Sequence, residues 1–231
     1  MPEVCVPIPY QREKAVAYAH YWAYRRNPEF LSFSQLGGDC TNFVSQCLFA
    51  GTGVMNYTPT FGWFYLSGND RTASWTGVEY LYNFLLQNQG AGPFATEAGI
   101  ESAQPGDVIQ FGDENGDFYH TVIVVEVPNP PTYEGIRVAA HSIDADCRPL
   151  DTYNFAKIRL LHIEGARRCI PEEQPPAPPE TLPPETPPQE VPPVPQPPPV
   201  PLAPPAETIP EGTAPEAPGS APESPYFPPF Y

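Results

Sequence analysis

The stretch that decides the fold is residues 37–46, whose sequence is GGDCTNFVSQ. It places Cys40 where a glycine-rich turn meets the start of a helix. Unpaired amide N–H groups and the positive helix end both favour thiolate over thiol at such a position. The helix is predicted from about residue 39 or 40 to residue 50, with Gly51 as its stop. Its buried stripe is formed by apolar residues at helical spacing: Phe43, Val44, Cys47 and Leu48.

Two histidines further along the chain lie in strand-like segments, His120 in residues 118–125 and His141 in residues 138–142. A thiol and an imidazole supplied by separate elements form the working pair of a cysteine hydrolase. We therefore predict Cys40 as the nucleophile and His120 as the general base and acid. This requires a His120 ring nitrogen within ~3.5 Å of the Cys40 sulfur.

A third polar group should hold the other nitrogen of His120 and fix its tautomer. His141 is the first candidate. If residues 118–127 and 136–142 form a hairpin centred near residue 131, position 120 faces roughly 141 or 142 across the strands. Asp144 is the alternative orienting residue, because a carboxylate stabilises an imidazolium more strongly. The sequence predicts no cofactor and no metal.

Each of these residues also has a structural interpretation. Cys40 can be a small buried hydrophobe near Phe43, and Asp39 is better explained as a helix N-cap than as a catalytic group. Cys147 follows His141 and Asp144, so it could lie near the site. A zinc site formed by Cys40, His120, His141 and Cys147 lacks the paired close spacing of zinc ligands. The remaining candidates are interpreted as core or structural residues: Cys5, Cys47, Cys169, His20 and His162.

The composition divides the chain of 231 residues into two parts. Residues 171–231 contain 25 prolines and nine glutamates but no lysine, arginine or cysteine. Such a segment cannot bury enough apolar surface to offset its chain entropy, and its proline runs favour polyproline II. We therefore predict one folded domain at residues 1–170 and a disordered, acidic, proline-rich tail at residues 171–231.

The net charge and the cysteine content limit the partners and the cellular compartment that we expect. The formal net charge is −16, without a basic stripe, which argues against nucleic acid or an anionic membrane as a partner. Five cysteines without a C-x-x-C motif do not resemble a disulfide framework, and a reducing compartment fits them better. The N-terminus lacks the pattern of a secretory signal, so a cytoplasmic location is expected by default, with signal-free release or association with a spore coat as alternatives.

Helical patterns come first and strand patterns second. Helices are expected at residues 11–26, 39–50 and 77–88, the last of them with a capping box formed by Thr76 and Glu79. Strands are expected at residues 107–111, 121–127, 136–141 and 157–163. Short separations without intervening helices indicate an antiparallel sheet. The sequence thus predicts an α+β domain with N-terminal helices packed on an antiparallel sheet.

Several of these segments resemble the bacterial putative amidase domain family. The similarity rests on residues 38–46, the P-G-D segment at 105–111, the HTVIV segment at 120–124 and the AHSID segment at 140–144. That family looks related to the NlpC/P60 and CHAP papain-like cysteine peptidases. The resemblance implies a papain-like fold, Cys40 as nucleophile, His120 as general base and His141 as the third polar residue. It also implies hydrolysis of amide bonds, as in peptidoglycan stem peptides.

The sequence supports one principal function and two alternatives. The principal prediction is a cysteine amidase or peptidase that acts through an acyl-enzyme. A non-catalytic binding or structural protein, associated with a coat or wall layer, would retain the same fold, and its aromatic-rich segment at residues 57–75 could line a groove. Acyl transfer onto an amine is a third possibility. The proline-rich tail, which ends in a cluster of aromatic residues, could bind a protein partner.

Overall fold

The computed structural model describes residues 3–172, and all structural statements below concern this part of the chain. It contains four α-helices, two short 3-10 helices and nine strands. The helices are α1 (Arg12–Trp22), α2 (Cys40–Thr52), α3 (Ala73–Thr76) and α4 (Val78–Gln87), with η1 (Ile100–Ser102) and η2 (Leu150–Thr152). The strands are β1 (Glu3–Ile8), β2 (Tyr65–Ser67), β3 (Asp70–Arg71), β4 (Gly92–Ala98), β5 (Val108–Gly112), β6 (Phe118–Glu126), β7 (Arg137–Ala140), β8 (Ala145–Pro149) and β9 (Lys157–Pro171).

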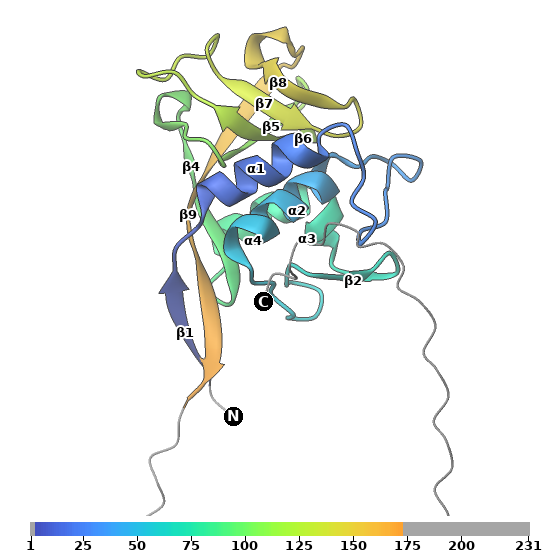
Figure 1. Cartoon of the computed structure of the whole chain (residues 1–231), viewed down its shortest axis with the longest axis vertical. Coiled ribbons are helices and arrows are strands. Elements are labelled where there is room, and N and C mark those ends of the chain that lie inside the picture. Colours follow the sequence, from blue (N-terminus) through green and yellow to red (C-terminus); the bar gives the residue numbers. More distant parts are fainter. Residues whose placement is uncertain (1–2, 173–231) are drawn as a thin grey trace, which may run out of the picture. The chain divides into compact units, whose positions relative to one another are not determined.

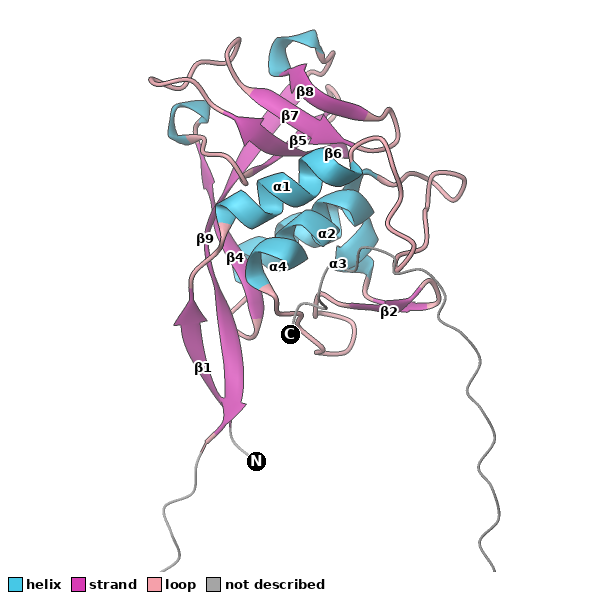
Figure 2. Cartoon of the chain, viewed as in Figure 1, coloured by secondary structure: helices cyan, strands magenta, loops and turns pink. Residues whose placement is uncertain are grey.

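Seven strands form one antiparallel sheet in the order β1-β9-β5-β6-β7-β8, with β4 also paired to β9. The long strand β9 organises the sheet, because β5, β4 and β1 pair with successive parts of it. Helices α1, α2 and α4 cover one face of this sheet (Figures 1 and 2). The α+β class with an antiparallel sheet is therefore confirmed.

The two faces of the sheet bury separate apolar clusters, and the alternation of side chains along each strand decides which residue joins which cluster. On the helical face, Ile123 and Ala139 pack with α2 residues such as Val44 and Leu48. On the opposite face, Val122, Val124 and the ring of Phe111 belong to the second cluster, which side chains from the loops complete. Along residues 122–125 of β6, the even-numbered side chains therefore face the second cluster and the odd-numbered ones face the helices.

Helix α2 begins at Cys40, as predicted, and ends two residues later than expected. Gly53 adopts the left-handed conformation (φ 64°) and caps the helix, while Gly51 remains inside it. A glycine at this position ends a helix without the steric cost that a Cβ would impose. The predicted capping box of the third helix is wrong. Gly77 is the N-cap of α4 without any side-chain cap, and Thr76 closes the preceding short helix α3.

Sequence patterns missed the first strand, β1, and the second half of the last strand, β9. Strand β1 pairs with the last third of β9, and the Cys5–Cys169 disulfide joins the two strands. This corrects the expectation that these cysteines do not form a disulfide framework. Their sequence separation of 164 residues hides the pairing from any local pattern. A disulfide of this kind is typical of oxidising compartments, which removes the cysteine-based argument for a reducing one.

One prediction lies almost wholly outside the described residues. The proline-rich tail predicted at residues 171–231 lies outside them, apart from its first two positions, so its disorder and partner remain predictions. None of the helices between residues 3 and 172 has the length and apolar character needed to cross a lipid bilayer.

Candidate functional site

Cys40 occupies the first position of α2, at the end of a turn that only glycine accommodates easily. Gly37 and Gly38 have φ values of 107° and 122°, in a region that side chains with a Cβ rarely adopt. The turn brings the chain from Phe33, whose carbonyl accepts a hydrogen bond from the Gly38 amide, directly into the helix. Cys40 is 8% exposed, so its thiol lies just below the surface.

The first turn of α2 leaves donors free beside this thiol. Among the described residues, the amide groups of Cys40, Thr41 and Asn42 have no hydrogen-bond partner, and the first bond of the helix runs from Phe43 N–H to the Asp39 carbonyl. Asp39 holds the N-cap position, but its carboxylate does not cap the helix. The helix start therefore offers several N–H groups to an oxyanion next to Cys40.

The Asp39 carboxylate points instead toward the sheet, where it is fully buried. Its Oδ1 accepts hydrogen bonds from the Phe33 amide (2.8 Å) and from Asn42 Nδ2 (2.9 Å), and its Oδ2 lies 2.8 Å from His141 Nδ1. Burial raises the pKa of Asp39, but the hydrogen bonds from His141, Phe33 and Asn42 outweigh this and lower it overall. Asp39 is therefore a buried, ionised partner for His141 and not a simple N-cap.

His141 lies on the helical face of the sheet, 1% exposed, with its ring stacked on Phe43 at 4.0 Å between centroids. Its Nδ1 faces Asp39, and its Nε2 lies 2.9 Å from the Trp22 carbonyl oxygen. Nε2 also lies 3.3 Å from Arg26 Nη1, so it has one acceptor and one donor beside it, whereas Nδ1 faces the Asp39 carboxylate. Asp39 therefore fixes the orientation of the ring through Nδ1.

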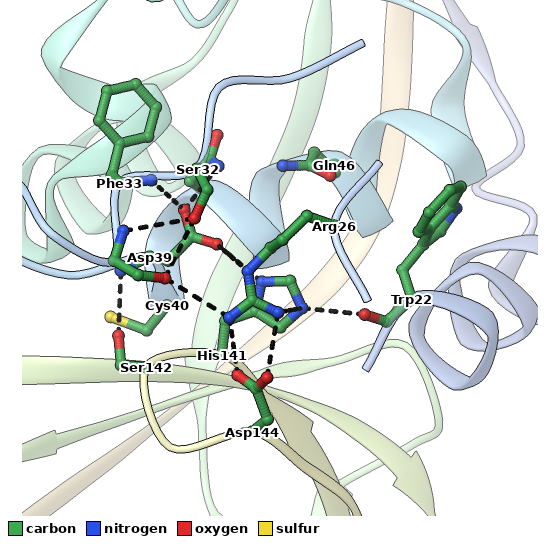
Figure 3. A network of polar contacts seen from close by, with 12 residues as sticks. Trp22, Arg26, Ser32, Phe33, Asp39, Cys40, Gln46, His141, Ser142 and Asp144 are labelled. Atoms are coloured by element: carbon green, nitrogen blue, oxygen red, sulfur yellow. Dashed lines mark hydrogen bonds and ion pairs between the residues drawn. The ribbon is translucent and has the colours of Figure 1, made fainter. Parts of the chain in front are cut away.

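An arginine closes the network around this histidine (Figure 3). Arg26 donates two hydrogen bonds to Asp144, at 2.8 and 3.1 Å, and its Nε lies 3.3 Å from Asp39 Oδ2. The Asp39 amide donates to Ser142 Oγ at 2.9 Å, which ties the start of α2 to the turn after β7. The alternative prediction required Asp144 to orient His120. In the structure Asp144 pairs with Arg26 instead.

His120 lies on the other face of the sheet, and no hydrogen bond joins it to Cys40. Its ring stacks against Phe111 and Tyr153 in the cluster remote from the helices. The neighbouring Thr121 points toward α2 instead, with its Oγ1 3.1 Å from Thr41 Oγ1. The predicted contact between Cys40 and His120 is therefore not made in the structure.

The predicted pair of His120 and His141 fails for a related reason. Strands β6 and β7 do form a hairpin, and the pairing of Ile123 with Ala139 centres it on residue 131, as expected. By the same register, Thr121 rather than His120 falls opposite His141. A shift of one residue moves a side chain to the opposite face of a sheet, so the two histidines are separated by the sheet itself.

The environment of His120 gives a testable dependence of stability on pH. Burial, with a contribution from the charge of Arg148, lowers the pKa of His120 to about 4. In the unfolded chain this pKa is about 6.5, so between these values the unfolded state binds more protons. The free energy of unfolding should therefore fall as the pH drops from about 6.5 to about 4, by roughly 3 kcal/mol from this residue alone.

The variant His120→Phe keeps an aromatic ring between Phe111 and Tyr153 but cannot titrate. We expect its free energy of unfolding, measured by urea denaturation at several pH values, to fall less steeply below pH 6.5 than that of the unaltered chain. Identical slopes for the two proteins would contradict the burial of a neutral His120.

The remaining free cysteines are poorly suited to nucleophilic attack. Cys47 is fully buried in the core, as predicted, and burial raises the pKa of its thiol well above the usual value. Cys147 is exposed on β8, where burial and the charges of Asp146 and Glu126 raise the pKa of its thiol to about 11. Neither thiol lies at the start of a helix, as Cys40 does.

A second carboxylate–histidine pair lies elsewhere in the fold. Asp107 of the P-G-D segment is fully buried and accepts hydrogen bonds from His162 Nδ1 (2.8 Å), from Arg12 (2.7 Å) and from two backbone amides. His162 borders a cavity of about 550 Å³ that also includes Glu101 and Glu164. This cavity is not lined by Cys40. The pair supports the structural interpretation of His162, because Asp107 ties β9 to α1 and to the start of β5.

Sequence reasoning missed two members of the Cys40 site. Asp39 was interpreted as a cap, although a cap cannot be distinguished in sequence from a residue whose carboxylate turns away from its helix. Arg26 was not considered, because it follows the first helix and carries no motif. Only the folded chain brings the guanidinium of Arg26 to the carboxylates of Asp39 and Asp144 and within 3.3 Å of His141 Nε2.

Comparison with known sequences identifies the family of the chain. Residues 9–163 match the family described as "Putative amidase domain", so the chain belongs to that family. The chain is also 40% identical over 120 residues to "Uncharacterized protein YhbB" of Bacillus subtilis (strain 168). The aligned part covers 50% of this chain and only 37% of that protein. No solved structure matches the chain.

Proposed function

We propose that this protein is a cysteine amidase or peptidase in which Cys40 is the nucleophile. The observation that carries the proposal is the position of Cys40 at the first turn of α2, beside unpartnered amide groups and the Asp39–His141 pair. The positive end of a helix favours an anion there, both the thiolate and the oxyanion that forms on an attacked carbonyl. Membership of the amidase domain family supports the same reaction class.

Geometry favours His141 over His120 as the proton-transfer group, although no hydrogen bond joins either imidazole to Cys40 Sγ among the described residues. His141 lies on the same face of the sheet as α2, and its partner Asp39 is the residue directly before Cys40. A histidine held at Nδ1 by a buried carboxylate is a recurring arrangement in hydrolases. His120 is on the other face, and its lowered pKa of about 4 makes it a weak base.

The proposed reaction proceeds in two steps. The Cys40 thiolate attacks the amide carbonyl, the carbon–nitrogen bond breaks, and the His141 imidazolium gives a proton to the leaving amine. Neutral His141 then takes a proton from water, which attacks the thioester and releases the acid and the thiolate. For these transfers, His141 Nε2 must exchange its contacts with the Trp22 carbonyl and Arg26 Nη1 for one with the leaving amine or water.

The proposed substrate class is a peptide amide, with peptidoglycan stem peptides as the first choice. This choice rests on the resemblance to NlpC/P60 and CHAP peptidases, and the papain-like fold is part of the same proposal. Two apolar side chains flank the turns that meet at Cys40, namely Leu36 (67% exposed) and Ile143 (72% exposed). They would suit an apolar group next to the cleaved bond.

A competition between thiols within one chain tests this proposal. We expect iodoacetamide, applied to the non-reduced protein at pH 7 in substoichiometric amount, to alkylate Cys40 before the more exposed Cys147. The reason is that the helix start stabilises a thiolate, whereas acidic neighbours oppose one at Cys147. Peptide mass spectrometry after brief labelling reads out both sites, and Cys47 serves as the buried control.

The opposite order of labelling would support the alternative function. If Cys147 reacts first and Cys40 stays unmodified until the protein unfolds, Cys40 is a core residue. The chain would then be a binding or structural protein that retains the family's fold.

A further inference from the structure

A cluster of metal-ligating side chains lies outside the candidate active site. His20 of α1 and the adjacent residues Asp146 and Cys147 of β8 place one ligand atom each within 4.8 Å of one another. His20 Nδ1 lies 2.8 Å from Asp146 Oδ1. His20 and Asp146 are 126 positions apart in the sequence, and the packing of α1 near the β7–β8 end of the sheet brings them together.

A fourth ligand is in reach of the same thiol. The Cys147 thiol donates a hydrogen bond to Glu126 Oε1 of β6 at 3.7 Å. Two oxygen or sulfur ligands of one tetrahedral zinc ion lie at a similar separation, because zinc–sulfur and zinc–oxygen bonds are about 2.3 and 2.1 Å long. The imidazole, the thiol and the Asp146 carboxylate are thus placed to surround one ion, and a rotation of the Glu126 side chain would bring in a fourth ligand.

We propose that His20, Asp146 and Cys147, with Glu126 as a further ligand, form a binding site for zinc or a similar borderline-soft divalent cation. The donor set selects the metal, since thiolate and imidazole are poor ligands for magnesium and calcium but good ones for zinc. Two carboxylates beside a thiol also concentrate negative charge that a divalent cation neutralises.

The position of this site suggests what the ion does. His20 belongs to the last turn of α1, two residues before the Trp22 carbonyl that contacts His141. Asp146 follows Asp144, the partner of Arg26, by two positions. A bound ion would fasten the end of α1 to the start of β8, directly after the turn that carries Asp144, and both segments adjoin the His141 network. It acts as a structural clip, remote from the reacting atoms.

Calorimetric titration of the full, non-reduced chain with zinc chloride in a chelator-free buffer tests the proposal. We expect one equivalent to bind, and we expect Cys147→Ser and His20→Gln each to weaken binding roughly tenfold or more. The matched control is His162→Gln, which removes another aspartate-paired histidine without an adjacent thiol. Unchanged affinity in both Cys147→Ser and His20→Gln would overturn the site.

Two measurements on the unaltered chain remain informative if a variant fails to fold. Cobalt(II) should produce the near-ultraviolet absorption of a sulfur-to-metal charge transfer, because a thiolate is among the ligands. Zinc should also slow the alkylation of Cys147 while leaving that of Cys40 unchanged. No cobalt–sulfur absorption, together with equal alkylation of Cys147 with and without zinc, would refute the proposal.

Discussion

Replacing Cys40 by alanine should reduce amide hydrolysis by about 10³-fold or more, while the fold persists. The sulfur is the atom that forms the covalent bond to the acyl group, so no neighbouring side chain can replace it. A methyl group at this position loses little packing, because Cys40 lies at the margin of the core with 8% of its surface exposed. Amine release from a peptidoglycan digest and from small peptide amides, followed by mass spectrometry, gives the rates.

The matched control for this experiment is Cys47→Ala, the same substitution seven residues further along the same helix. Cys47 is fully buried in the core, so its loss should lower the free energy of unfolding without a large effect on turnover. Circular dichroism at the assay temperature establishes that both variants are folded. Turnover by Cys40→Ala within a few-fold of the unaltered chain would remove this residue from the mechanism.

The variant His141→Gln should lose about 10²- to 10⁴-fold in turnover, the usual contribution of a general acid–base group. Glutamine can still donate a hydrogen bond to Asp39, but it cannot exchange a proton with the leaving amine or with water. His120→Phe should retain turnover within a few-fold, because that ring lies across the sheet from α2. The comparison therefore distinguishes the assignment based on geometry from the one based on sequence.

The same two variants can also contradict the assignment of His141 as the proton-transfer group. A large loss in His120→Phe with near-normal turnover in His141→Gln would show that the sequence-based assignment was correct. It would also mean that β6 changes its register in the working enzyme, because in the described register His120 faces Phe111 and not α2. Measuring the unfolding free energy of both variants separates loss of catalysis from loss of the fold.

Much of the fold was predictable because its signals are local. The glycines before Cys40 and the helical spacing of the apolar residues Phe43 and Leu48 correctly predicted where α2 begins. Runs of β-branched residues indicated β5, β6, β7 and the first half of β9. The short hairpin of β2 and β3 was missed, and so were β1, β4 and β8 of the main sheet, which have weak patterns of their own. These strands of the main sheet exist because β9 and β7 offer them backbone partners.

The site was only partly predictable because the contacts in it are not local. The sequence alone indicated a cysteine at a helix start and a histidine at the end of a strand, since both follow from the order of neighbouring residues. Only the tertiary structure decided that His141 shares a face with α2 and that His120 does not, because one step along a strand exchanges the two faces of a sheet. It also decided that Asp39 bonds His141 and that His20 meets Cys147. These contacts join residues more than 100 positions apart, and packing of helices on the sheet is what brings them together.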